Sequence, residues 1–375
     1  MNRRRAYALA LAASALIAGV GAAGPTPVPT PARTSSPTPT PTPSATQSDG
    51  TLQILTYRGY AEYGGTSPKV NWVGNFEKET GCRIAKLDTV QSAKEMEDLS
   101  ASRPYDIISA GPVLAAKLVE ANLVQPVDPA KVSGYDDIDR RFRDMSTVSG
   151  KVYGVPYLWG YHEFIYDSTK VKGDLKQAFA SDRVALRDSP LTIADAALAV
   201  GSAKDPYELS QDQLDRAVAL LEQSKARTYW RSPIDLVQGF ATGSLDYAQA
   251  TPYYRLLLQK AGKPVKTLAT PETTGWVDSW MLGVNIPDTT CAYRWLNWVT
   301  AANAQRDAAA WVGLAPANAK ACKGRAKLMC DLYGRGKKLD RVDFAVRPPG
   351  DCRADDGECT DYLTWGKKWE ALLAK

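Results

Sequence analysis

The sequence predicts a two-lobed α/β protein, in which each lobe is a mostly parallel sheet flanked by helices and a ligand cleft lies between the lobes. Roughly 325 residues follow the first 50, which is more than one hydrophobic core usually organises. Short apolar runs alternate with amphipathic stretches in this part, which is typical of a layered α/β fold. Two aromatic stretches, 153–160 and 276–286, suit strands that pass between lobes. Sites in such lobes lie at the carboxyl ends of strands, so two facing lobes form a cleft.

The apolar patterns predict individual elements in order. The stretch 70–80 carries Val70, Val73 and Phe76 at helical spacing, and Gly81 follows as a residue suited to end a helix. We expect further helices at 114–121, 212–226, 254–259, 291–302, 304–312 and 362–373. We expect strands at 52–57, 82–90, 105–109, 153–160 and 276–286.

We expect the chain to change lobe along the two aromatic stretches. It enters the second lobe near residue 158 and leaves it near residue 278. The first lobe then comprises 51–157 and 279–318, and the second comprises 158–278 and 319–375.

The amino-terminal residues 1–23 have the pattern of a secretory signal peptide. Three arginines at positions 3 to 5 precede an apolar run over 6–20, and small residues follow. An uncleaved anchor is the alternative, although the run is short for a membrane span. No cysteine precedes Cys82, so the signal junction offers no acceptor for an amino-terminal lipid.

Residues 24–50 form a linker rich in proline, threonine and serine. The tract has little apolar surface to bury, so it is expected to be disordered. Its prolines favour an extended, semi-stiff spacer. Two interpretations stay open: a tether that holds the folded part to the cell envelope, and a solvated or glycosylated tail.

The net charge of +5 belongs to the amino-terminal segment rather than to the folded part. Four of the 46 basic residues and one of the 41 acidic residues lie in the first 50, which leaves 42 bases and 40 acids. A nearly neutral body argues against nucleic-acid binding. We expect an exported protein, periplasmic or associated with the cell envelope, that is a monomer and binds no nucleic acid.

The six cysteines of an exported chain favour disulfides. Metal binding is the weaker alternative, because no Cys-x-x-Cys spacing occurs and His162 is the single histidine. Six cysteines allow 15 pairings. Among these we expect the sequence neighbours to pair, which leaves the two distant cysteines for each other: Cys322 with Cys330, Cys352 with Cys359, and Cys82 with Cys291.

The motifs of common enzymes do not occur in the sequence. It contains no Gly-rich phosphate loop and no Gly-x-Ser-x-Gly elbow. A hydrolase triad would depend wholly on His162. We therefore expect a binding protein without a cofactor or a metal, and an envelope hydrolase is the most distant alternative.

Four short stretches, in this order and spacing, carry a resemblance to a known family. They are Tyr57-Arg58-Gly59-Tyr60-Ala61-Glu62-Tyr63, Tyr105-Asp106-Ile107-Ile108, Val155-Pro156-Tyr157-Leu158-Trp159-Gly160 and Trp276-Val277-Asp278-Ser279. With them the chain resembles the polyamine-binding subunits of bacterial ABC importers, which have the type II periplasmic binding protein fold. The resemblance covers most of the chain between residues 52 and 369.

The resemblance implies a site for a small cationic amine. Asp278 would meet a ligand ammonium group, with Trp276 as the neighbouring wall, and Tyr60 and Tyr63 would be aromatic residues of the first lobe. Carboxylates and aromatic faces suit such a ligand, because both attract an ammonium group. Trp276 as a core aromatic and Asp278 as a structural hydrogen-bonding group are the alternatives.

Two further acids enter the predicted site with their own alternatives. Asp188 resembles the second-lobe acid that meets the other end of the ligand, or it caps the helix that follows. Glu62 adds charge to the site, or it only positions its turn.

Several positions depart from the family pattern, in which more aromatic and polar residues surround the ligand. These departures predict weaker polyamine binding or a different amine. They are Ala61, Gly111, Val113, Leu191, Gln249 and Leu314.

The predicted function is capture of a polyamine, of the spermidine or putrescine type, or of a related cationic amine. The protein would deliver it to the membrane permease subunits of an ABC importer. An amine-sensing module that signals to a membrane receptor is the alternative.

Overall fold

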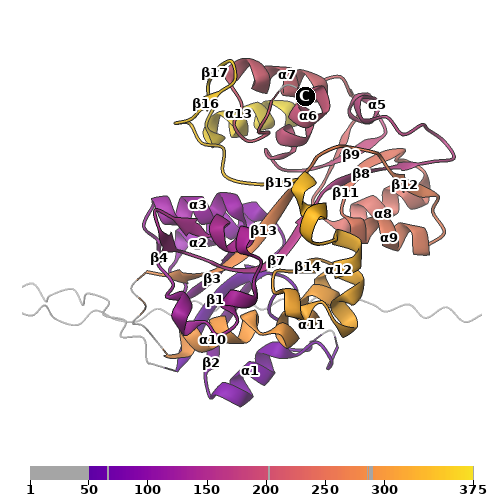
Figure 1. Ribbon diagram of the computed structural model, residues 1–375. Helices are drawn as coiled ribbons and strands as arrows, with labels where there is room; N and C mark the ends of the chain where they lie inside the picture. Colours follow the sequence, from indigo (N-terminus) through magenta and orange to yellow (C-terminus); the bar gives the residue numbers. More distant parts are fainter. Residues whose placement is uncertain (1–49, 66, 202, 285, 287–289, 375) are drawn as a thin grey trace, which may run out of the picture. The chain divides into compact units, whose positions relative to one another are not determined.

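The computed structural model describes residues 50–375 except 66, 202, 285, 287–289 and 375 (Figure 1). The predicted signal peptide, 1–23, and the predicted linker as far as residue 49 lie outside the described residues. In the described part, no helix has the length and apolar character needed to cross a membrane.

The first sheet contains both predicted crossing strands. Its order begins β14 (Ala315–Pro316), β7 (Val155–Tyr161), β13 (Thr273–Gly283) and continues β3 (Ile107–Ala110), β1 (Thr51–Tyr57), β2 (Arg83–Val90), while β4 (Val124–Gln125) and β15 (Val342–Phe344) also pair with β13. β1 is parallel to β2 and β3, but β13 is antiparallel to β3 and β7. The sheet is therefore mixed rather than mostly parallel, because β13 returns from the second lobe against the direction of its neighbours.

The second sheet is smaller and is also mixed. Its strands, in order, are β10 (Thr228–Trp230), β9 (Val184–Arg187), β11 (Tyr247–Ala250), β8 (Glu163–Asp167) and β12 (Val265–Thr267). β9 is parallel to β10 and β11, and β8 is antiparallel to β11 and β12. Two short antiparallel pairs stand apart: β5 (Thr147–Val148) with β6 (Lys151–Val152), and β16 (Arg353–Ala354) with β17 (Gly357–Glu358).

The helices begin and end where local signals place them. Asn71 caps α1 by accepting a hydrogen bond from the Gly74 amide at 3.0 Å, and Gly81 ends it with a φ of 73°. The α-helices are α1 (Trp72–Thr80), α2 (Ala93–Ser102), α3 (Pro112–Glu120), α4 (Arg140–Met145), α5 (Leu175–Ala180), α6 (Thr192–Val200), α7 (Gln211–Leu221), α8 (Pro233–Thr242), α9 (Pro252–Lys260), α10 (Thr290–Thr300), α11 (Ala302–Val312), α12 (Lys327–Tyr333) and α13 (Tyr362–Leu373). Short 3-10 helices lie at Pro129–Lys131, Tyr135–Asp137, Ala319–Ala321, Gly324–Ala326 and Gly336–Arg341.

The predicted lobe boundaries at 158, 279 and 319 stay a prediction, and the sheets show where the segments around them pack. β7 and β13 pair along the first sheet from Val155 to Tyr161 and from Gly275 to Trp280, so both crossing strands lie in the first sheet (Figure 1). The segment after β14 also divides. Tyr333 of α12 packs in the core of the first lobe, whereas Trp365 and Trp369 of α13 pack in the core of the second.

The three predicted disulfides are confirmed. Cys82 at the start of β2 is bonded to Cys291 of α10, across 209 residues of sequence. The two short bridges join Cys322 to Cys330 and Cys352 to Cys359. The long bridge therefore fastens an edge strand of the first lobe to a helix that the chain forms only after its return from the second lobe.

Candidate ligand-binding site

Asp278 lies on β13 and is 4% exposed. The register between β7 and β13 shifts between Asp278 and Ser279, and such a bulge re-aims the side chains beside it. The Tyr60 hydroxyl donates a hydrogen bond to Oδ2 of Asp278. Burial raises the pKa of Asp278 to about 6, although the Tyr60 hydrogen bond and the Arg187 charge oppose the rise.

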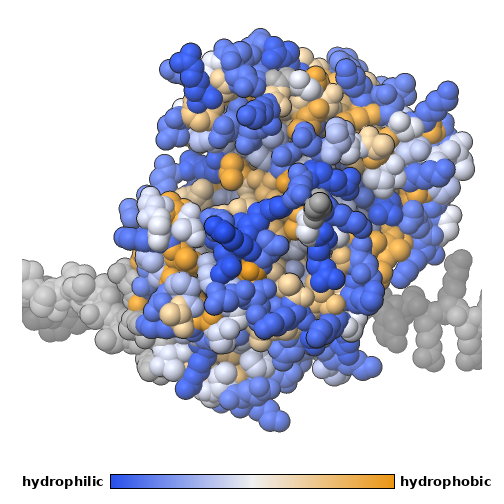
Figure 2. Space-filling view, in the orientation of Figure 1, coloured by the Kyte–Doolittle hydropathy of each residue, from blue (hydrophilic) through white to orange (hydrophobic). Residues whose placement is uncertain are grey.

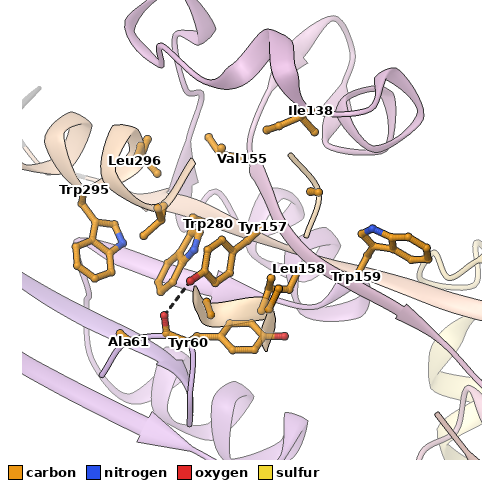
Figure 3. Close-up of a cluster of buried hydrophobic side chains, with 14 of the residues drawn as sticks. Tyr60, Ala61, Ile138, Val155, Tyr157, Leu158, Trp159, Trp280, Trp295 and Leu296 are labelled. Atoms are coloured by element: carbon orange, nitrogen blue, oxygen red, sulfur yellow. Dashed lines mark hydrogen bonds between the residues drawn. The ribbon is translucent and has the colours of Figure 1, made fainter. Parts of the chain in front are cut away.

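Tyr60 is held rigidly behind Asp278 by its own backbone. Its carbonyl oxygen accepts hydrogen bonds from Trp72 Nε1 at 3.1 Å and from the Tyr157 hydroxyl at 3.2 Å, and the second of these bonds is drawn in Figure 3. The side chain is 3% exposed, and its ring meets the ring of Tyr57 edge-on at 5.6 Å. Tyr60 therefore positions the carboxylate rather than offering an open aromatic face.

Trp276 lies on the same face of β13 as Asp278, because residues two apart on a strand share a face. Its indole fits against Gly160 of β7: a Cβ atom there would lie 2.8 Å from Trp276 Cη2 and 3.0 Å from Leu314 Cδ2. The His162 ring is stacked on it at 4.8 Å between centroids. Trp276 as a whole is half-buried.

Gly111 lies close to the Asp278 carboxylate. A Cβ atom at Gly111 would lie 3.1 Å from Asp278 Oδ1 and 3.9 Å from the Tyr57 hydroxyl. Burial and the Asp278 charge raise the pKa of Tyr57 far above its usual value, so this hydroxyl is a permanent donor. The glycine backbone thus approaches the carboxylate closely, and a larger residue at position 111 would crowd Asp278.

Arg187, which the sequence analysis did not single out, also belongs to this site. It ends β9, and its Cζ lies over the Trp276 ring at 5.4 Å from the centroid. Its amide donates to Gln249 Oε1 at 2.9 Å, and its carbonyl accepts from Thr192 Oγ1 at 2.9 Å. The sequence offered no signal for it, because a four-residue strand shows no periodicity and Arg187 lies outside the motifs that match the family.

A buried polar network lies beside this site and joins the second lobe to β13. Asp195 of α6 accepts hydrogen bonds from Thr274 Oγ1 and from Gln249 Nε2, each at 2.7 Å. Burial raises the pKa of Asp195 to about 7. Burial, together with the Arg187 charge, holds the pKa of His162 well below its usual value, so His162 is neutral here. Gln249, another position that departs from the family pattern, is thus a structural member of this network.

Two of the predicted site residues face the start of α1 instead. Tyr63 is 43% exposed, and its hydroxyl donates to Glu77 Oε1 at 3.1 Å. The carbonyl oxygen of Glu62 accepts a hydrogen bond from the Val73 amide at 3.0 Å, and its side chain is half-exposed. The Glu62 backbone therefore positions its turn, which was one of the two predicted alternatives.

Asp188 uses both carboxylate oxygens within the second lobe. Oδ2 forms an ion pair with Arg231 Nε at 2.5 Å, and Oδ1 accepts a hydrogen bond from Trp369 Nε1 at 3.0 Å. Leu191, not Asp188, occupies the cap position of α6. Asp188 therefore ties α13 to the loop after β9.

The structure thus brings together Tyr60, Trp276 and Asp278, and adds Tyr57, Gly111 and Arg187. On the face shown in Figure 2 the surface is hollowed between the α3 side and the α7 side, with apolar side chains at the floor of the hollow. The described residues contain no group of three or more His, Cys, Asp or Glu side chains placed to hold a metal ion. The candidate site therefore offers a ligand one carboxylate, one guanidinium group and aromatic side chains.

A two-lobed α/β protein with one small polar site at its crossing strand is the architecture of a solute-binding protein. The family model described as "Bacterial extracellular solute-binding protein" matches residues 71–326, and the chain belongs to this family. Its fold is that of the type II periplasmic binding proteins.

Among curated proteins, the chain is similar to the putrescine-binding periplasmic protein SpuD of Pseudomonas aeruginosa (strain UCBPP-PA14). The identity is 28% over 101 residues, which are 26% of this chain and 27% of the relative. The match therefore spans only about a quarter of either protein.

Two solved structures share the fold over nearly their whole length. A putative spermidine/putrescine ABC transporter protein from Listeria monocytogenes has a TM-score of 0.68 at 17% identity, covering 86% of this chain and 99% of that one. The Atu4243-GABA receptor has a TM-score of 0.65 at 19% identity, covering 86% and 98%.

Proposed function

We propose that this protein captures a small solute that carries an ammonium group, a polyamine or a related amine, and delivers it to the permease subunits of an ABC importer. The observation that carries the proposal is Asp278. Its carboxylate is buried, and no lysine or arginine of the described residues lies within ion-pair distance of it. A buried carboxylate without a cationic partner is costly, and a ligand ammonium group supplies that partner.

The surroundings of Asp278 support a cationic ligand in two further ways. Tyr60 fixes the carboxylate by a hydrogen bond but brings no charge. The half-buried Trp276 ring lies on the same strand face, and an ammonium group over an aromatic ring gains about 0.5–2 kcal/mol. Asp278 and Trp276 together form a wall suited to one ammonium group and the methylene groups next to it.

The names of the similar proteins agree with this class of ligand. One is named for putrescine, one for spermidine and putrescine, and one for GABA. Each of these solutes has a primary ammonium group on a short methylene chain. The shared chemistry, rather than any one of the three solutes, is what we transfer to this protein.

Isothermal titration with putrescine, spermidine, spermine and 4-aminobutanoate tests the proposal. We expect the wild-type protein to bind at least one of them, and we expect Asp278→Asn to weaken that binding by on the order of 2 kcal/mol or more. Binding of none at millimolar concentration would contradict the proposed ligand class. Unchanged affinity in the variant would remove Asp278 from the site.

Asp188→Asn is the matched control. Both acids are poorly exposed, but Asp188 already has Arg231 and Trp369 as partners. We therefore expect Asp188→Asn to alter ligand affinity by less than about threefold, since no ligand contact is lost. A large loss from Asp188→Asn alone would instead place the ammonium group in the second lobe.

A further inference from the structure

The guanidinium of Arg187 is the second charge of the site. It is half-buried and lies over the ring of Trp276, the residue that also flanks Asp278. Its backbone is fixed on both sides by Gln249 and Thr192, so the side chain starts from a rigid position at the end of β9. The backbone of Arg187 is therefore fixed at the site, unlike that of a residue on an exposed loop.

The Arg187 guanidinium forms no hydrogen bond or ion pair with the described residues. Neighbouring arginines of the second lobe differ in this respect. Arg255 pairs with Glu163 at 2.6 Å, Arg231 with Asp188 at 2.5 Å, and Arg183 with Asp246 at 2.7 Å. A guanidinium has five donors in a planar fork that matches a carboxylate. The fork of Arg187 is thus available to a ligand.

A purely cationic ligand fits this pair of charges poorly. Its first ammonium group would neutralise Asp278, but its further ammonium groups would share the site with Arg187, and like charges at close range are unfavourable. The acid that was expected to receive the second ammonium group, Asp188, is already engaged by Arg231 and Trp369. The described site therefore holds one position for a cation and one for an anion.

We infer that the ligand is a zwitterion of the amino-acid type, whose ammonium group binds Asp278 and whose carboxylate binds the fork of Arg187, with its methylene groups against Trp276. This inference rests on the proposed function, since it assigns the second end of the same ligand. It makes Arg187 the residue that selects an amino acid over a diamine of equal length.

Matched ligands test the inference by titration calorimetry. 4-Aminobutanoate and 5-aminopentanoate are compared with 1,4-diaminobutane and 1,5-diaminopentane, and ornithine is compared with 1,4-diaminobutane, from which it differs by one carboxylate. We expect wild-type protein to bind the best carboxylate-bearing ligand about tenfold tighter than its diamine, because a charge-assisted bidentate contact replaces a repulsion.

Three variants separate this inference from the proposed function. Arg187→Gln should lower the affinity for the amino acids by about tenfold and leave the affinity for the diamines unchanged or higher. Asp278→Asn should lower the affinity for both classes of ligand. Arg187→Lys keeps the charge without the fork and should fall between wild type and Arg187→Gln. Arg231→Gln removes an exposed guanidinium of the same lobe and should leave the preference unchanged.

The possible outcomes distinguish the two proposals. Tighter binding of diamines by wild type, with no loss of amino-acid affinity in Arg187→Gln, would overturn the zwitterion inference and keep the proposed function. Failure of both ligand classes to bind would overturn both. Thermal unfolding of each variant checks the fold. Arg187→Gln removes the contact with the Trp276 ring but no ion pair among the described residues, so it should still unfold cooperatively, at a slightly lower temperature than the wild type.

Discussion

At the scale of single residues, two opposing effects act on the Asp278 carboxyl group. Burial disfavours its charged form, while the Tyr60 hydrogen bond and the Arg187 charge favour it, and the pKa settles at about 6. The carboxyl group is therefore ionised at neutral pH and becomes protonated in mildly acidic solution. Only the ionised form attracts an ammonium group, so the affinity for the proposed amine ligand should depend on this titration.

Amine affinity should consequently fall between pH 8 and pH 5. Amines stay protonated throughout this range, so the titrating partner is Asp278, and at one pH unit below its pKa the affinity should be about tenfold weaker than at pH 8. Calorimetry at a series of pH values measures the effect. In Asp278→Asn this titration is gone, so the remaining weak binding should depend less on pH between pH 5 and pH 8. An equally steep profile in that variant would assign the dependence to another group, such as Asp195.

The residue scale also shows how far sequence patterns reach. The shared strand face of Trp276 and Asp278 was predictable, because residues two apart on a strand point to the same side. Tyr63 and Asp188 match the family motifs equally well in sequence. Their hydrogen bonds, to Glu77 and to Trp369, depend on contacts across 14 and 181 residues that no local pattern reports. No sequence pattern indicated a role for Arg187.

At the scale of elements, the contact between β7 and β13 shapes the site. Gly160 on β7 has no side chain, and the Trp276 indole fills that space. The same contact explains why the aromatic stretch on β7 contains a glycine among larger residues. The position of the Trp276 ring, and with it the wall beside Asp278, therefore depends on Gly160.

Gly160→Ala should weaken both the fold and ligand binding. The new Cβ atom would lie 2.8 Å from Trp276 Cη2, so the indole must move, and overpacking of this kind costs about 1–3 kcal/mol. Thermal unfolding and calorimetry measure the two effects. Gly366→Ala is the control, because nothing lies within 4 Å of its new Cβ atom and the site lies within α13, where alanine favours the helix. Wild-type affinity in Gly160→Ala would contradict this role of the strand contact.

The disulfide between β2 and α10 fixes the first lobe across the chain's excursion into the second. A bridge that closes a longer loop restricts the unfolded chain more, so Cys82→Ala with Cys291→Ala should lower the free energy of unfolding by about 2–5 kcal/mol. The bridge between Cys352 and Cys359 spans only 7 residues of sequence. Replacing both of these cysteines by alanine should therefore lower the free energy of unfolding by less. Denaturant unfolding compares the two double variants; a larger loss from the short bridge would refute the ranking.

Element prediction succeeded where apolar patterns were long enough to show a period. β1, α1, α7 and α13 all match the predicted stretches closely, although α7 ends at Leu221 rather than 226. The strands of the second sheet were missed because they have three to five residues each and carry polar positions, as in Tyr-Ala-Gln-Ala of β11. Their pairing comes from tertiary contacts between β8, β9 and β11 rather than from local sequence.

At the scale of the whole molecule, the two sheets and the crossing strands explain why the site lies where it does. β13 carries Trp276 and Asp278 from the first lobe, and β9 of the second lobe ends at Arg187 above the same ring. A ligand that touches both would stabilise the arrangement in which both groups meet it. Such a ligand shifts the molecule only as far as it binds that arrangement more tightly than the open one.

A crystal structure of the protein grown with the tightest-binding solute of the titrations tests the central claim most directly. We predict the ligand ammonium nitrogen within about 2.7–2.9 Å of an Asp278 carboxylate oxygen, with ligand carbon atoms against the Trp276 ring. An ammonium group bound at Asp188, with no ligand atom at Asp278, would contradict the claim.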